Sequence, residues 1–195
     1  WVKRKQMTEF RAWILLLTVP LLVVALFLWL APPRHNPFAP IDLTDKLGLG
    51  THAKLERART HREVCFSALD SAGILYTPLE DAPKGEKCGL YNALTLDRTL
   101  TPYSATLSMT CAETAAVYTW ERHVARPAAV DILGSPLARI ETYGSFSCRN
   151  IAGSGRLSEH AHANAIDISG FRLEDGRLID VKTHWKQGGP EAKFL

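Results

Sequence analysis

A long apolar stretch near the N-terminus places the strongest constraint on this chain. Residues 13–31 read WILLLTVPLLVVALFLWLA and contain no charged side chain. As an α-helix this stretch spans roughly 28 Å, close to the hydrocarbon thickness of a bilayer. A core helix of a soluble protein would show a polar face, and this stretch has none. The sequence therefore predicts a transmembrane anchor, preceded by a short cytoplasmic tip, over residues 1–31.

The flanking charges predict how the anchor is oriented. Lys3, Arg4, Lys5 and Arg11 precede the apolar stretch, and basic residues favour the cytoplasmic side. A cleaved signal peptide is the alternative. Signal peptides usually have a shorter apolar region that ends at a small-x-small site, and residues 28–30 (LWL) are a poor one. We expect a single-pass protein of the inner (cytoplasmic) membrane whose remaining residues face the periplasm.

The anchor is followed by a proline-rich segment, APPRHNPFAP, at residues 31–40. Such a composition is typical of a stiff, extended spacer, so residues 32–50 are interpreted as a linker. Residues 51–195 are then enough for one domain with a core of its own. The formal net charge of +3 is too small to indicate a nucleic-acid partner.

Four cysteines, an even number, indicate disulfides in an extracytoplasmic compartment. They are Cys65, Cys88, Cys111 and Cys148, and no CxxC pair occurs that would indicate a redox motif. Buried free thiols are the alternative. Of the three possible connectivities, we expect Cys65–Cys88 and Cys111–Cys148, because this pairing closes loops of modest length.

Periodicity and turn signals predict an α+β domain, with helices packed on a small antiparallel sheet. Apolar spacing favours a helix over 51–72, and Thr110 with Glu113 forms a capping box that begins a second helix, ending before Pro127. An Asp-Gly pair at 175–176 predicts a hairpin between the last two strands. The expected extended segments are 74–79, 90–96, 140–148, 166–173 and 178–182.

The segment 158–167, SEHAHANAID, carries the candidate chemistry. An imidazole at His160 and a carboxylate at Asp167 are ligands suited to zinc. The small alanines between them let the backbone fold closely around an ion. A spacing of this kind is common in itself, and a surface histidine with a strand-end aspartate is the alternative interpretation.

The pattern SxHxxxxAxD resembles the zinc signature of a peptidase group. That group includes D-alanyl-D-alanine carboxypeptidases and dipeptidases, lysostaphin-type endopeptidases and the hedgehog signalling domain. Further segments are YGSFSCR at 143–149, LSEHA at 157–161, NAIDI at 164–168, GF at 170–171, DG at 175–176 and Trp185. Through these segments, over about residues 60–195, the chain resembles more closely the bacterial extensin-like C-terminal domain.

The resemblance implies a role for several residues. His160 and Asp167 would be two of three zinc ligands. Arg149 would hold a substrate carboxylate or a developing oxyanion, and Ser158 would brace the histidine loop. The implied third ligand is a histidine of a later HxH-type motif, two residues after the catalytic base. No such motif occurs in these 195 residues, so both are expected after Leu195.

The implied activity is zinc-dependent cleavage of the peptide stems of peptidoglycan. A non-catalytic cell-wall-binding or scaffold domain is the alternative. One position departs from the group, which usually has glycine where this chain has Ala163. If that position needs a positive φ, the alanine is strained there by about 1 kcal/mol. His162 and His184 match no ligand position of the pattern.

Overall fold

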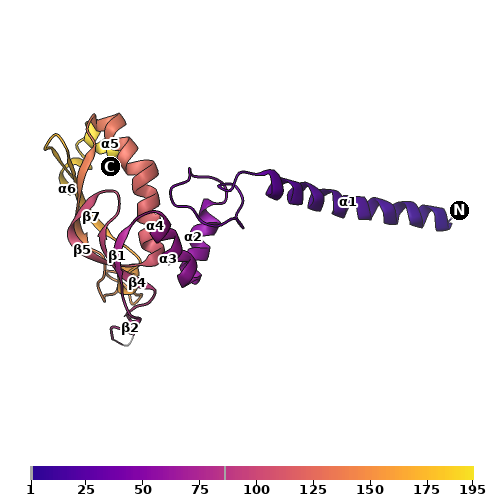
Figure 1. Ribbon diagram of the computed structural model, residues 1–195, viewed down its shortest axis with the longest axis horizontal. Coiled ribbons are helices and arrows are strands. Elements are labelled where there is room, and N and C mark those ends of the chain that lie inside the picture. Colours follow the sequence, from indigo (N-terminus) through magenta and orange to yellow (C-terminus); the bar gives the residue numbers. More distant parts are fainter. Residues whose placement is uncertain (1, 86) are drawn as a thin grey trace.

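The computed structural model describes residues 2–85 and 87–195, with side chains placed from residue 13 onward. Helix α1 (Val2–Leu30) extends away from the rest of the chain (Figure 1). None of the side chains at 13–30 is buried, and the helix is long and apolar enough to cross a membrane. Single-pass anchors and signal sequences share these properties. The side chains of the basic flank, at positions 3, 4, 5 and 11, lie outside the described part.

Residues 31–50 form a folded collar rather than the expected extended linker. The Gly50 N–H donates to the carbonyl of Arg34 (3.1 Å), and Lys54 Nζ donates to the carbonyl of Pro33 (2.7 Å). Leu43 is buried in the main core of the domain. The expectation of an extended segment is wrong because burial of this leucine, together with these hydrogen bonds, favours the folded form over a solvated polyproline chain.

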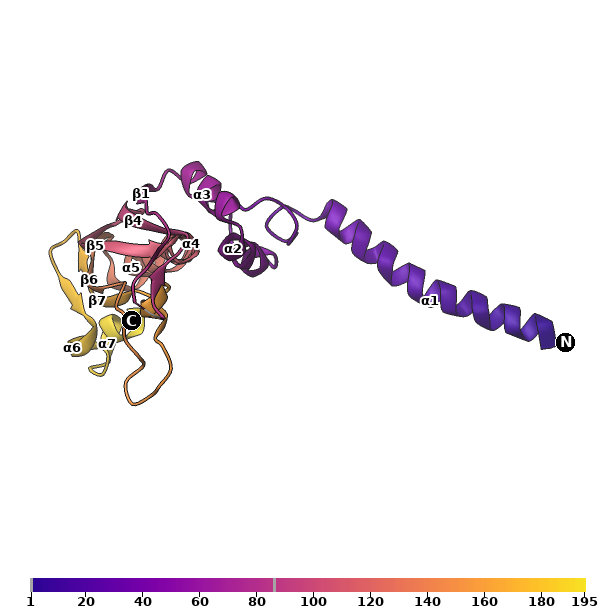
Figure 2. The same cartoon turned by 90° about the horizontal axis from the view of Figure 1, so that it is seen from below.

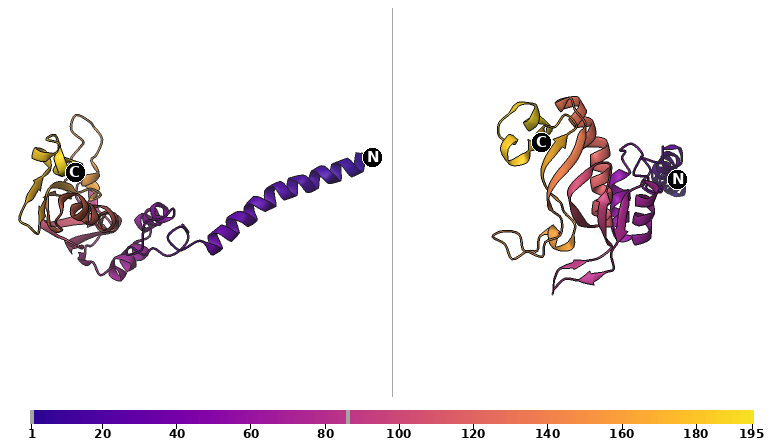
Figure 3. Two further views of the ribbon diagram at one scale, coloured as in Figure 1. Left: turned by 90° about the horizontal axis from the view of Figure 1, so that it is seen from above. Right: turned by 60° about the vertical axis from the view of Figure 1, so that its left-hand side comes forward.

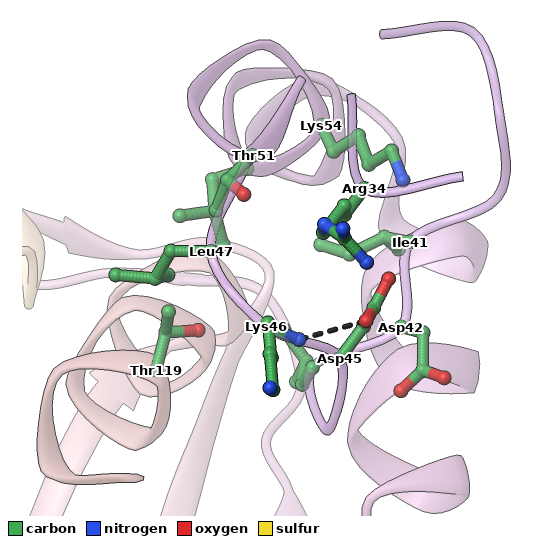
Figure 4. Close-up of a pocket in the computed structure, with 11 residues that line it drawn as sticks. Arg34, Ile41, Asp42, Asp45, Lys46, Leu47, Thr51, Lys54 and Thr119 are labelled. Atoms are coloured by element: carbon green, nitrogen blue, oxygen red, sulfur yellow. Dashed lines mark hydrogen bonds between the residues drawn. The ribbon is translucent and has the colours of Figure 1, made fainter. Parts of the chain in front are cut away.

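The collar and α2 (Thr51–Thr60) enclose a small pocket. Arg34, Asp45 and Lys54 gather there (Figure 4). Burial lowers the pKa of Lys54, and the nearby Asp45 carboxylate opposes this effect. The cavity measures about 20 Å³, which is room for about one water molecule. The pocket therefore has no space for a larger ligand, and Lys54 holds the collar through its hydrogen bond to the Pro33 carbonyl.

The predicted α+β class is confirmed, with a six-stranded sheet at its centre. Neighbouring strands are antiparallel except β5 and β6, which run parallel and pair at Tyr103 and Ile140. The sheet is mixed because a helical crossover connects these two strands. The order across the sheet is β1 (Leu75–Pro78), β4 (Ala93–Arg98), β5 (Pro102–Thr110), β6 (Leu137–Gly144), β7 (Asp167–Leu173) and β8 (Leu178–Asp180). A separate short hairpin joins β2 (Ala82–Pro83) and β3 (Gly89–Leu90).

The crossover is one continuous helical segment along one face of the sheet (Figure 3, right). It comprises α4 (Cys111–Trp120), a π-helical turn η1 (Glu121–Ala125) and α5 (Arg126–Leu133). The predicted start at Cys111 is confirmed, since Thr110 Oγ1 accepts from the Glu113 N–H at 3.1 Å. The predicted end before Pro127 is wrong. Pro127 lies in the first turn of α5, a position where proline is tolerated.

The remaining helices are short. The helix expected over 51–72 is divided into α2 and α3 (Arg62–Ser71) by His61, whose backbone is extended. Both lie between α1 and the sheet (Figure 2). A 3-10 turn, η2 (Glu159–His162), precedes β7, and α6 (Val181–His184) and α7 (Gly189–Phe194) follow β8. The hairpin predicted at the Asp-Gly pair connects β7 and β8.

Two apolar clusters pack against the sheet. The first joins α3 and α4 to β4 and β5, and the second joins α5 to β6, β7 and β8. Tyr103 on β5 contacts both clusters. The second cluster fixes the position of β6 and β7, and the long loop between these two strands carries the candidate site.

The expected disulfide pairing is wrong. Cys65 is bonded to Cys111 and Cys88 to Cys148, with Cα–Cα distances of 6.0 and 5.7 Å. The β4–β5 hairpin returns the chain to its own start, so the Cys111 N–H donates to the carbonyl of Asn92 at 2.8 Å, and α3 packs on α4. Loop length is a poor guide to disulfide pairing, because doubling the length of a loop adds only about 0.6 kcal/mol to the entropic cost of closing it.

We therefore expect peptide mapping under non-reducing conditions to recover Cys65 with Cys111 and Cys88 with Cys148. The first bridge spans 46 residues. Replacing both of its cysteines by serine should lower the free energy of unfolding by about 4 kcal/mol, because the unfolded chain regains that loop entropy. A peptide that joins Cys65 to Cys88 would contradict the structure.

Glu121, in the π-helical turn, is completely buried. Its Oε2 accepts hydrogen bonds from the hydroxyl groups of Thr99 and Tyr103, while Oε1 has no partner among the described residues. Burial raises the pKa of this carboxyl above its ordinary value, although the Arg126 guanidinium acts in the opposite direction. The carboxyl joins the β4–β5 hairpin to the long helix, and its burial makes the folded state favour the protonated form.

This raised pKa predicts a pH dependence of stability. The folded state holds the Glu121 proton more tightly than the unfolded state, so the stability of the protein should fall as the pH rises above about 4.5, the ordinary value. Glu121→Gln should flatten this part of the stability–pH curve, measured by urea unfolding. Equal slopes for the two proteins between pH 4 and about pH 8 would refute the assignment.

Candidate functional site

The side chains of His160 and Asp167 converge, as the sequence pattern predicts. His160 lies in η2 and Asp167 is the first residue of β7. His160 Nε2 and Asp167 Oδ1 are 3.2 Å apart. The imidazole is buried and the carboxylate is half-exposed, so solvent reaches the pair from the aspartate side.

Two hydrogen bonds set the orientation of His160. The hydroxyl of Ser158, which caps η2, accepts from the His160 backbone N–H at 3.4 Å. His160 Nδ1 lies 2.6 Å from the carbonyl oxygen of Ser145. Because a carbonyl oxygen only accepts, Nδ1 carries a proton, and Nε2 is the nitrogen that faces Asp167. The Ser158 hydroxyl thus contacts the backbone of the histidine turn, and its bracing role stays a prediction.

Arg149 lies at the same place. Its Nη2 is 3.7 Å from Asp167 Oδ2, and both side chains are half-exposed. The backbone around it is well held, since the Ser158 N–H donates to the Arg149 carbonyl and the Ser147 N–H donates to the His160 carbonyl. The neighbouring Cys148 is bridged to Cys88. The loop between β6 and β7, which projects from the end of the sheet (orange, Figure 2), thus presents a half-exposed guanidinium beside the carboxylate.

Glu113 is a neighbour that the sequence analysis missed. It was interpreted as half of a capping box, but in the described part of the chain its carboxylate makes no hydrogen bond back to Thr110. The carboxyl is partly buried close to His160. Burial raises the pKa of Glu113, the His160 imidazole lowers it and Glu159 raises it. The capping box explained Glu113 from its neighbours in the sequence alone. The sequence analysis therefore missed the electrostatic interaction between Glu113 and His160.

The other histidines lie apart from this pair. His162 is exposed on the turn of η2, and His184 Nδ1 accepts from the backbone N–H of Asp180 at 3.0 Å. Among the side chains of residues 13–85 and 87–195, no group of three His, Cys, Asp or Glu is arranged to hold a metal ion. The described residues therefore bring together two potential ligands, with an arginine beside them.

Ala163, which ends η2, has a left-handed backbone, with φ 54° and ψ 31°. The alanine, which stands where the related group usually has glycine, is therefore strained in the way the sequence analysis described for a positive φ. The residue is completely buried, and its carbonyl accepts from the Thr110 N–H at 2.8 Å, which attaches the histidine turn to the end of β5. Packing around the buried Ala163 and this hydrogen bond thus stabilise the strained conformation.

Ala163→Gly should leave stability almost unchanged. Glycine removes about 1 kcal/mol of left-handed strain but also a buried methyl group worth about 0.8 kcal/mol. Ala115→Gly is the matched control: this alanine is equally buried but lies within α4. In that helix, loss of the buried methyl group and loss of helix propensity should together lower the free energy of unfolding by about 2 kcal/mol. Urea unfolding that showed equal losses for the two variants would contradict the strain.

Comparison with known proteins supports one family. The model of a family described as "Extensin-like protein C-terminus" matches residues 63–195, which is more than half of the chain and includes every residue of the site. No curated protein and no solved structure gave a match. The match begins in α3 and ends at Leu195, so it covers the sheet, both disulfides and the histidine loop. The chain belongs to the extensin-like protein C-terminal family.

Proposed function

We propose that this chain carries a zinc-dependent, peptidase-like site that acts on the peptide stems of peptidoglycan. The observation that carries the proposal is the 3.2 Å separation of His160 Nε2 and Asp167 Oδ1. Two atoms that each lie about 2.0–2.2 Å from one tetrahedral zinc ion are separated by roughly 3–3.5 Å. The pair therefore has the spacing of two adjacent ligands.

The donor set fits the ion in a second way. Because the Ser145 carbonyl keeps the proton on Nδ1, neutral His160 turns the lone pair of Nε2 toward a carboxylate oxygen. Two acceptors facing each other favour a cation or a proton between them. A zinc-binding histidine typically donates its other N–H to a carbonyl or carboxylate, as His160 does here.

Two ligands are fewer than a catalytic zinc site requires, since such sites use three protein ligands and keep one position open. The third ligand and the catalytic base stay a prediction: a histidine of an HxH-type motif that follows Leu195. With all three ligands, zinc would supply a Lewis acid that polarises the scissile carbonyl and makes a water molecule more acidic.

Arg149 would bind the substrate. Its ion pair with Asp167 is long and half-exposed, so little is lost when the guanidinium turns to another carboxylate. Arginine offers two parallel N–H groups to such a group, which suits the terminal carboxylate of a stem peptide. The two disulfides agree with an oxidising compartment, where peptidoglycan is found, and α1 would hold the domain at the periplasmic face of the inner membrane.

The test uses a chain that continues past Leu195, solubilised in detergent, and a competitive zinc chelator. His160→Ala and Asp167→Ala should each lower zinc affinity at least tenfold, as loss of a ligand does more than loss of the groups behind it. Both should abolish release of amino acids from a stem peptide. His162→Ala is the matched control on the same turn and should change neither property. Residues 1–195 alone should bind zinc weakly.

The outcomes separate the two functions. Unchanged zinc affinity in His160→Ala and Asp167→Ala would contradict the zinc site. Zinc binding and peptide binding without any cleavage would instead favour a cell-wall-binding domain. Arg149→Lys should raise the KM for a peptide with a free carboxylate and leave zinc affinity unchanged, because lysine cannot form the paired contact.

A further inference from the structure

A second and larger cavity lies on the other side of the η2 turn. On a 3-10 turn, side chains two residues apart point about 120° away from each other. His160 therefore faces Asp167, whereas His162 lines a cavity of about 310 Å³. Its walls come from α2, the turn after β3, the start of α4 and η2 itself. The volume lies within the range that is usual for sites of small ligands.

One wall of this cavity is an aromatic ring. Tyr91 is half-exposed and belongs to the lining. A Cβ atom on Gly89 would collide with this ring, so the ring rests directly on the Gly89 backbone. The glycine thereby places the ring beside the cavity, and the part of the ring that does not contact it is free to receive a ligand.

Other residues of the lining carry hydrogen-bonding groups that the structure holds in place. Asn92 has a left-handed backbone (φ 49°), and Asp81 Oδ1 accepts from its N–H at 2.8 Å. Backbone strain of this kind is concentrated at functional sites. Asn164 Nδ2 donates to Glu159 Oε2 at 3.0 Å, which orders a second carboxamide next to a carboxylate.

The charge of the cavity is close to balanced. Arg59 and Glu159 both line it, and Arg59 is already paired with Glu56 at 3.1 Å. The floor is formed by small side chains, Ala58 and Ala112. A phosphate or a strongly charged ligand has no excess of opposite charge here, and an apolar ligand would leave the polar walls unsatisfied. The lining favours an uncharged, polar ligand with one flat apolar face.

We propose that this cavity binds an N-acetylated pyranose residue of a glycan chain. The C–H face of a pyranose carries partial positive charge and packs on the negative face of the Tyr91 ring. Its hydroxyl groups suit the carboxamides of Asn92 and Asn164 and the carboxylate of Glu159. The amide of an acetamido group can form hydrogen bonds with these side chains, and its methyl group can pack against Ala58 and Ala112.

The cavity would add a sugar-binding subsite to the proposed peptidase-like site. The identity of the glycan rests on that proposed function. If His160 and Asp167 act on a stem peptide, the sugar that bears this stem lies within the length of that peptide, at most about 3.5 Å per residue. The cavity lies on the other side of the same turn, and a helical turn with its side chains is about 10 Å across. Sugar binding itself requires neither zinc nor Arg149, so it is measured separately from hydrolysis.

The experiment titrates the full chain, in detergent and with EDTA present, with a tetramer of β-1,4-linked N-acetylglucosamine, and follows heat release. Saturable binding is expected. Tyr91→Ala should weaken it roughly tenfold, whereas Tyr91→Phe, which keeps the ring, should not. Gly89→Ala should weaken it too, by displacing the ring. Tyr143→Ala is the control, because this exposed tyrosine lies on β6 away from the cavity lining.

Three results would overturn the inference: no saturable binding, unchanged binding in Tyr91→Ala, or displacement of the tetramer by a stem peptide that has no sugar. The last result would make the cavity a peptide subsite. Circular dichroism of each variant shows whether it is folded. Because the titration contains a chelator, its failure leaves the zinc proposal standing, and failure of zinc binding leaves the sugar proposal standing.

Discussion

The pairing of β6 with β7 is the constraint on which the candidate site depends. Gly144, the last residue of β6, lies opposite Asp167, the first residue of β7, and Thr142 Oγ1 donates to the Asp167 carbonyl at 2.8 Å. The whole histidine loop leaves and returns between these two strands. Since ordering so long a loop is entropically costly, its internal hydrogen bonds and the Cys88–Cys148 bridge must offset that cost.

The strain at Ala163 and the bridge at Cys148 act on the two arms of this loop. The first arm, from Ser145 to Arg149, is fixed by the bridge and by the hydrogen bond from the Ser147 N–H to the His160 carbonyl. The second arm ends in the left-handed turn that returns the chain to β7. The imidazole is thus oriented by its surroundings before any ligand binds, a condition that precise metal and substrate sites share.

The features that could be predicted from the sequence are those determined over a few residues. The cap at Thr110, the Asp-Gly hairpin and the convergence of His160 with Asp167 each depend on local geometry or on one motif. The disulfide pairing and the burial of Leu43 were missed or mispredicted, because each depends on packing between segments far apart in the chain. Strand β5 was missed although it forms a hairpin with β4, the strand directly before it. The helix was expected to end before Pro127 but continues to Leu133 after a π-helical turn, a geometry that no single-residue preference indicates.

The folded collar has a mechanical consequence for a domain held by α1. Fully extended, residues 31–50 would reach roughly 65 Å. Folded onto α2, with Leu43 in the core, they form a short, stiff connection instead of a long, flexible one. If α1 spans a membrane, a domain mounted in this way would sample only a thin layer next to the bilayer. Any molecule that binds beside His160 and Asp167 would then have to enter that layer, so its distance from the membrane would decide whether it meets the site.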